Sequence, residues 1–308
     1  PPAPDRAEVL GDFLLNPSRA WLRDRLGVQW PRNDAGDDVD REPLGPDRRT
    51  RWSVIEAVVA WETQAPGLLA HPERLQPALR AHATLPPGHD GDTLVEEAVQ
   101  VARLLVDARD RHRAGAPVRR IAAHGDAAPH GLAFAFDDVH GSTRVVATAG
   151  KPKGKRRVRA AFEHLLLASV LGEDATTVLI TEGEAPKRKG DDAAVEEAGP
   201  VLEERCFTGL SRAQALDALA ALLALWHDGQ RSPLPFMPDS AAAYVDALAK
   251  EPARKASNGR SDAERAWRAA RDVYTRHDGG GEDRDPWQQL AFRPHGLFPA
   301  FSHPVCAR

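Results

Sequence analysis

Five short runs of β-forming residues in the middle of the chain constrain its fold more than any other feature of the sequence. They cover residues 118–123, 132–139, 143–149, 176–182 and 203–207. In the second run Leu132, Phe134 and Phe136 alternate with other residues, so we expect one face of that strand to be buried. Between the second and third runs, residues 140–142 (His-Gly-Ser) predict a tight hairpin turn.

Helical spacing separates and follows these runs. Val158, Phe162 and Leu166 recur at helical intervals, which predicts a helix that crosses from the third strand to the fourth. A longer helix is expected to begin after Ser211 and to stop at Gly229. The predicted order is a helix, three strands, a helix, two strands and a helix. This order indicates a mixed α/β fold with a helix packed on a sheet face.

Helices are also expected before the strands. Asn16 is a candidate N-cap before Pro17, Gly27 follows as a stop, and capping boxes at Ser53 and Thr93 predict two further helix starts. After the strands, a proline-rich segment precedes a helix that contains Trp267. We therefore predict a helical lead-in at 1–115, an α/β core at 116–230 and a C-terminal extension at 231–308.

Composition excludes several classes of protein. With 41 Lys and Arg against 45 Asp and Glu, the formal charge is −4, so the chain is not a free-standing basic nucleic-acid binder. It has no apolar run near the ~18 residues that a membrane span needs. Cys206 and Cys306 are too few for a disulfide framework and fit a reducing cytoplasm, and we find no signal peptide. Because the chain begins with Pro1, we expect it to be part of a longer protein.

The predicted order of elements resembles the core of the PD-(D/E)XK nucleases. In that fold an acid late in the second strand and another in the third hold Mg²⁺, and a nearby Lys positions water. Asp137 and Asp138 end the second run as the first acid should, but residues 143–150 contain no Asp, Glu or Lys. The pair is either a vestigial metal site or two solvated hairpin residues, and the empty third strand favours the latter.

No sequence motif indicates another kind of catalytic site. Twelve histidines are scattered without metal-ligand spacing. Phosphate-binding, dinucleotide-binding and serine-hydrolase motifs are absent from the sequence. We therefore expect no catalytic residue, no metal site and no cofactor in this chain.

One segment of the chain, called the basic run below, is unusually rich in Lys and Arg. Its six cations in nine positions are Lys151, Lys153, Lys155, Arg156, Arg157 and Arg159. The run leads into the predicted crossover helix, where cationic side chains and N-terminal amides together suit phosphate groups. It is therefore a candidate DNA-binding segment. The alternatives are a solvated loop or a contact with an acidic protein surface.

Longer stretches of the chain resemble the C-terminal domain of RecC, the gamma subunit of exodeoxyribonuclease V. The resemblance runs in order through residues 10–28, 40–44, 85–88, 149–151 leading to 163–165, 232–235 and 285–287. It covers nearly the whole chain, so it is more specific than any single motif.

The resemblance implies a nuclease-like domain that has lost its catalytic site and acts as a scaffold in the RecBCD helicase-nuclease. It implies a RecB-like helicase-nuclease and a RecD-like helicase as partners, and these subunits would use the ATP and Mg²⁺. Double-stranded DNA ends and separated strands would be the nucleic acid. Two other functions stay open: an active metal-dependent nuclease with displaced acidic residues, and a protein-protein adaptor that never meets DNA.

Overall fold

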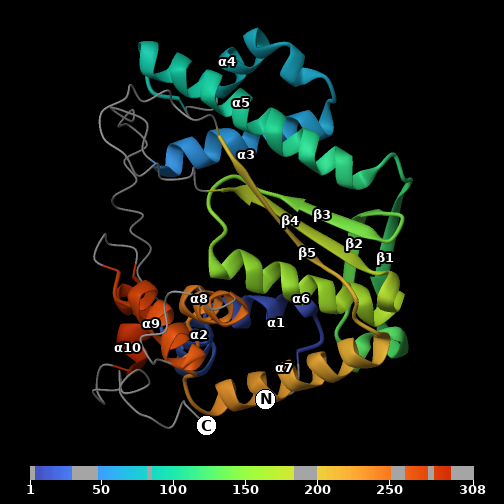
Figure 1. The fold of residues 1–308 in the computed structure, drawn as a ribbon, viewed down its shortest axis with the longest axis vertical. Helices are drawn as coiled ribbons and strands as arrows, with labels where there is room; N and C mark the ends of the chain where they lie inside the picture. The colour runs from blue at the N-terminus through green and yellow to red at the C-terminus, as the bar shows by residue number, and fades with distance from the viewer. Residues whose placement is uncertain are drawn as a thin grey trace.

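The computed structural model describes residues 4–29, 48–81, 85–183, 200–250, 261–276 and 281–292, and it has a five-stranded mixed sheet at its centre (Figure 1). The strands are β1 (Val118–Ala123), β2 (Phe134–His140), β3 (Thr143–Ala147), β4 (Thr176–Glu182) and β5 (Leu202–Phe207), in that spatial order. All five predicted strands are confirmed, with small shifts at their ends.

The direction of the strands follows from their connections. β1, β2 and β3 pair antiparallel, and the β2–β3 turn is a two-residue hairpin in which Gly141 has φ 60°. β4 lies parallel to β3, so the chain must cross the sheet between them, and α6 (Gly154–Leu171) makes this crossing. β5 returns antiparallel to β4.

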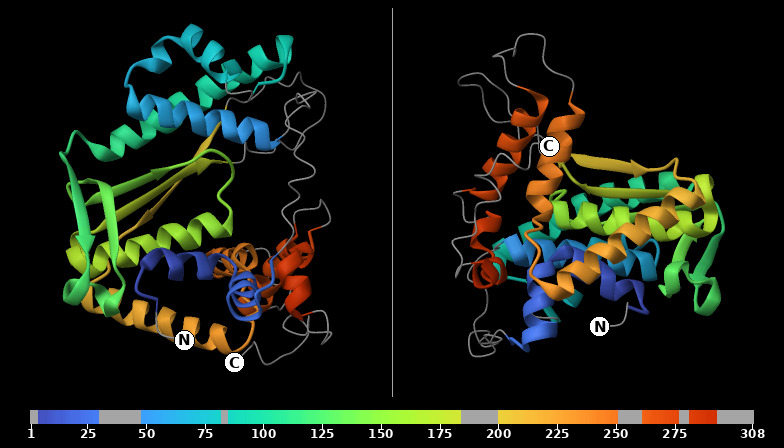
Figure 2. Two further views of the ribbon diagram at one scale, coloured as in Figure 1. Left: turned by 180° about the vertical axis from the view of Figure 1, so that it is seen from behind. Right: turned by 90° about the horizontal axis from the view of Figure 1, so that it is seen from below.

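Helices cover both faces of the sheet (Figures 1 and 2). On one face lie α3 (Arg48–Gln64), α4 (Pro72–Ala81) and α5 (Gly88–Arg113). Their apolar side chains pack on Val145, Val178 and Ile180. On the other face lie α1 (Ala7–Leu15), α6 and α7 (Arg212–Arg231), packed on Phe134 and Phe136. The interior of β4 is buried on both faces, which explains its unbroken run of β-branched and apolar residues.

The C-terminal helices are α8 (Pro238–Ala249), α9 (Asp262–Tyr274) and the short α10 (Pro286–Phe292). α8 packs on α6, α10 packs on α2 (Pro17–Leu26), and α9 packs on α8. Glu282 accepts hydrogen bonds from the Asp239 and Ser240 N–H groups at 2.9 and 2.8 Å, so its carboxylate caps α8. Burial raises the pKa of Glu282, although these bonds oppose the rise. Gln288 on α10 lies 3.1 Å from Ser18 on α2.

Several predicted helix ends are confirmed and others are wrong. Asn16 caps α2 by accepting a hydrogen bond from the Arg19 N–H, and Gly27 ends that helix with φ 64°. Ser53 and Thr93 do not cap helices; they lie inside α3 and α5. A capping pattern is local, and the helical turns before these residues make contacts elsewhere in the fold: Arg51 pairs with Glu97 and Glu182, and Asp92 pairs with Arg80. None of the described helices is both long and apolar enough to cross a membrane.

His164 is a buried titratable group between α6 and the sheet. Its side chain is 2% exposed, and its Nδ1 lies 3.2 Å from Thr177 Oγ1 on β4. Within the described residues its Nε2 has no hydrogen-bond partner. Burial lowers the pKa of His164, so the native chain holds a neutral imidazole.

We expect this imidazole to make stability depend on pH. The unfolded chain binds a proton below about pH 6.5 while the native chain resists it, so the free energy of unfolding falls as the pH drops through this range. In His164→Phe the fall between pH 7 and pH 5 is smaller, by up to ~1.4 kcal/mol per pH unit, the value for one proton. Urea unfolding at several pH values measures the slope. The exposed His124→Gln variant is the control, and equal slopes in His164→Phe and the unaltered chain contradict the prediction.

Candidate nucleic-acid interface

The loop between β3 and α6, residues 148–153, is fixed by two glutamates. Glu56 on α3 accepts hydrogen bonds from the Thr148 hydroxyl and the Ala149 N–H, both at 2.6 Å. Glu182 at the end of β4 accepts a hydrogen bond from the Gly150 N–H. Because both acceptors belong to packed elements, the backbone of this loop has one defined path.

Arg51 on α3 holds Glu182 in place. Its two terminal nitrogens lie 3.1 and 2.8 Å from the two oxygens of Glu182, which is a bidentate pair. Burial alone raises the pKa of Glu182, but the hydrogen bonds from Arg51 and Gly150 outweigh burial and keep the pKa below its usual range. The carboxylate is therefore ionised at neutral pH and keeps both contacts.

The first arginine of the basic run folds back over the loop. Arg156 donates a hydrogen bond to the Lys151 carbonyl oxygen at 2.8 Å. Burial lowers the pKa of Arg156, although a guanidinium stays charged at neutral pH. Gly150 has φ 81°, and a Cβ there would lie 3.1 Å from Arg156 Nη1. Glycine thus suits both the backbone conformation and the close approach.

Arg157 and Arg159 each pair with a carboxylate of another helix, and Arg159 also pairs within α6. Arg157 makes a bidentate pair with Asp246 on α8 at 2.5 and 2.6 Å, and its side chain is only 14% exposed. Arg159 lies 2.8 Å from Glu163, one turn along α6, and 3.2 Å from Asp12 on α1. These arginines therefore join α6 to its neighbours.

The lysines of the run lie at the surface. Lys151 and Lys153 are exposed in the loop and at the N-cap of α6. Lys155 is also exposed, with its Nζ 3.9 Å from Asp285 Oδ2. The structure thus divides the basic run into three exposed lysines and three less exposed arginines.

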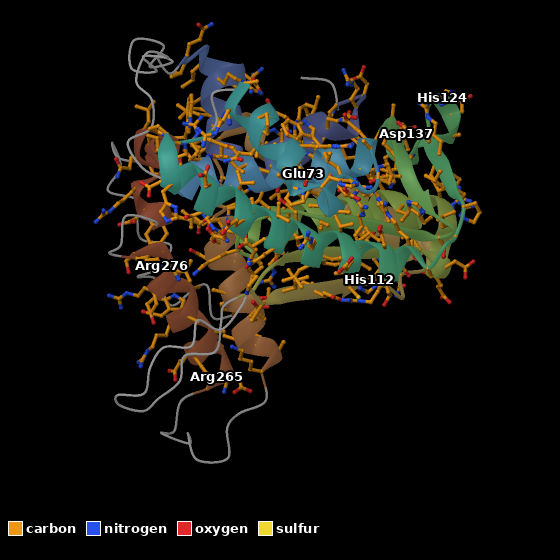
Figure 3. The ribbon with its side chains drawn as sticks, turned by 90° about the horizontal axis from the view of Figure 1, so that it is seen from above. Glu73, His112, His124, Asp137, Arg265 and Arg276 are labelled. Atoms are coloured by element: carbon orange, nitrogen blue, oxygen red, sulfur yellow. The ribbon has the colours of Figure 1, made fainter. Side chains whose placement is uncertain are left out.

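The two aspartates of β2 do not form one site. β2 continues to His140, so Asp137 and Asp138 lie inside the strand, where both stand opposite Arg120 of β1 in a β-bulge. Asp137 lies at the surface, as Figure 3 shows, and is 3.2 Å from Arg120. Asp138 is instead 2.9 Å from Arg144 of β3. Each carboxylate has its own arginine.

Arg144 places a positive charge where β2, β3 and α6 meet. Its guanidinium pairs with Asp138 and with Glu163 of α6, and it lies 4.5 Å from the centre of the Phe136 ring. The Arg144 and Glu163 side chains are 14% and 13% exposed. Among the described residues, no group of three or more His, Cys, Asp or Glu is arranged to hold a metal ion.

Arg144, Glu163, Glu56 and Glu182 are not among the site residues expected from the sequence. The four-residue spacing from Arg159 to Glu163 was a usable signal, because such pairs face each other on a helix. The pairings of Glu56 and Glu182 had no such signal, since the partners of Glu56 lie 92 and 93 residues away in the sequence.

We expect the Arg157–Asp246 pair to stabilise the docking of α8 on α6. In a double-mutant cycle with Arg157→Ala and Asp246→Ala, the coupling free energy is about 1–2 kcal/mol, above that of exposed pairs because the geometry is bidentate and half-buried. Urea unfolding of the four proteins measures it. The exposed Asp228–Arg231 pair, 3.8 Å apart, is the matched control and should give less than ~0.5 kcal/mol. Equal coupling for the two pairs would refute this role.

Comparison with known proteins places this arrangement in a family. A search of curated proteins gave no match. The model of one protein family, described as the RecC C-terminal domain, matches residues 2–249. The match includes the whole sheet, the β3–α6 loop and α8. The chain therefore belongs to the RecC C-terminal domain family.

Proposed function

We propose that this chain is a non-catalytic, DNA-facing scaffold domain of a RecC subunit. It would act within the RecBCD helicase-nuclease in the repair of double-strand breaks by homologous recombination. Membership of the RecC family supports the complex and its role in DNA repair. The order of elements, with three antiparallel strands, a crossover helix and a parallel strand, supports a PD-(D/E)XK-like core.

The position of Arg144 is the observation that best supports a non-catalytic role for the chain. Its guanidinium pairs with Asp138, a candidate for the first acid of such a nuclease, and with Glu163 of α6. Mg²⁺ needs several oxygen ligands in octahedral geometry. Here those oxygens already have a cationic partner. β3 offers no acid or lysine to complete a cage.

The exposed lysines support the DNA-facing part. Lys151, Lys153 and Lys155 lie at the start of α6, where a helix N-terminus adds positive potential. We propose that they contact phosphates. Arg156, Arg157 and Arg159 then belong to the same basic run as positioning residues, which hold the loop and the helix in place.

The other subunits complete the proposed assembly. A RecB-like helicase-nuclease and a RecD-like helicase would be the partners and would use ATP and Mg²⁺, while this domain needs no cofactor of its own. Its DNA would be duplex ends and the strands that part from them. The compartment would be the cytoplasm.

We expect the chain to lack nuclease activity. Linear duplex and single-stranded DNA stay intact with Mg²⁺ or Mn²⁺, because the acid-and-lysine set of β3 is missing and Arg144 neutralises Asp138. Gel analysis of end-labelled DNA measures this. Degradation that disappears in Asp138→Ala would favour the active-nuclease hypothesis instead.

Salt dependence tests the DNA contact. In Lys151→Gln/Lys153→Gln, the slope of log K against log salt on forked DNA becomes shallower by about 0.7–0.9 for each phosphate that the protein no longer neutralises. The variant binds DNA of every sequence more weakly by a similar factor, because phosphates carry no base information. The matched control is Arg212→Gln/Arg231→Gln, which removes the same charge from exposed residues at the two ends of α7 and should keep the slope. Unchanged slope and affinity in the lysine variant would favour the adaptor hypothesis.

A further inference from the structure

Trp52 is an exposed tryptophan beside the β3–α6 loop. Its side chain lies on α3, and the residue is 42% exposed, whereas Val54, Ile55 and Val58 on the same helix are fully buried. The indole Cδ1 would lie 3.6 Å from a Cβ on Gly150, so the ring borders the loop at its glycine. A single exposed apolar side chain is common at protein surfaces, so the groups around the ring decide what it could bind.

Cationic side chains surround this ring. Arg49 is exposed and lies one turn before Trp52 on the same helix, so the two side chains are neighbours. Across the loop, the Arg156 guanidinium borders the same side of Gly150 as the indole. Lys151 and Lys153 follow Gly150 in the chain and are exposed.

Two carboxylates lie near these charges. Glu56 is bound to the Thr148 hydroxyl and the Ala149 N–H, and Glu182 is bound to Arg51 and the Gly150 N–H. Both also attract the Arg156 guanidinium, so the cationic rim consists chiefly of Arg49, Lys151 and Lys153. An aromatic face within a cationic rim is the combination that binds single-stranded nucleic acid.

We propose that Trp52 stacks on an unpaired base of single-stranded DNA, with the neighbouring phosphates held by Arg49 and Lys153. This inference rests on the proposed DNA-facing role and names the form of DNA that the site takes. A paired base is already stacked on both faces, so the indole selects unpaired nucleotides. Stacking tolerates every base, so the site binds without sequence preference. A protein partner would also cover an exposed tryptophan, but the cationic rim favours a polyanion.

Two oligonucleotides separate stacking from charge. One is oligo-dT of about twelve nucleotides, and the other has the same backbone with abasic residues, so both offer the same phosphates. The 308-residue chain should bind oligo-dT more tightly by about 5- to 150-fold for each stacked base. Fluorescence anisotropy of the labelled oligonucleotides measures the ratio of the two affinities.

Variants at position 52 test the residue itself. Trp52→Ala should bring the ratio close to one and leave the affinity for the abasic strand unchanged. Trp52→Phe should keep part of the preference, because a phenyl ring also stacks. The control is Trp21→Ala, which changes a half-exposed tryptophan on α2 and should keep the full ratio. Arg49→Gln should lower the affinities for the two strands by the same factor and make the slope of log K against log salt shallower.

A ratio that Trp52→Ala leaves unchanged would overturn the proposal, whether both affinities stay the same or fall by the same factor, because the indole then does not stack on a base. If the same variant also weakens the assembly with the helicase subunits, the ring is part of a protein interface. In each case the proposed DNA-facing role stands if the Lys151→Gln/Lys153→Gln variant still shows a shallower salt slope on forked DNA. Absence of that effect, or no DNA binding at all, overturns the proposed function as well.

Discussion

The Arg144 guanidinium, held between Asp138 and Glu163, is the interaction on which the central part of the structure depends. It joins β2, β3 and α6 through one side chain. Glu163 also pairs with Arg159, which in turn pairs with Asp12 on α1. Arg144 and Glu163 are largely shielded from water, whereas Asp138, Arg159 and Asp12 lie nearer the surface. Removal of either Arg144 or Glu163 would leave the other largely buried without this partner, which is costly in free energy.

Pairing with carboxylates also distinguishes the residues of the basic run. Successive residues of a helix point in directions about 100° apart, so charges that are adjacent in the sequence face different parts of the protein. Arg157 reaches Asp246 on α8, while Arg159 reaches Glu163 and Asp12. The lysines precede the first turn or begin it, and they lie at the surface.

These internal pairs also prepare the proposed nucleic-acid surface. Glu56 and Glu182 hold the loop backbone, so Gly150, Lys151 and the Trp52 ring keep fixed relative positions. A surface that is ordered before binding loses less conformational entropy when DNA arrives. In this proposal the carboxylates near the loop serve as anchors, and the exposed lysines, Arg49 and Trp52 make the contacts.

The sequence by itself determined the elements that local patterns encode. Alternating apolar residues and a Gly-containing turn predicted the strands and the hairpin, and Asn16 with Gly27 predicted the ends of α2, because each signal lies within a few neighbouring residues. The tertiary structure decided the rest. A β-bulge opposite Arg120 separated the roles of Asp137 and Asp138, and α3 and α5 begin before Ser53 and Thr93, where Arg51 and Asp92 pair with distant residues. Arg157 and Arg159 find Asp246 and Asp12 across 89 and 147 residues of chain. Only the fold brings such distant charges together, so no spacing in the sequence could distinguish the paired arginines from the exposed lysines.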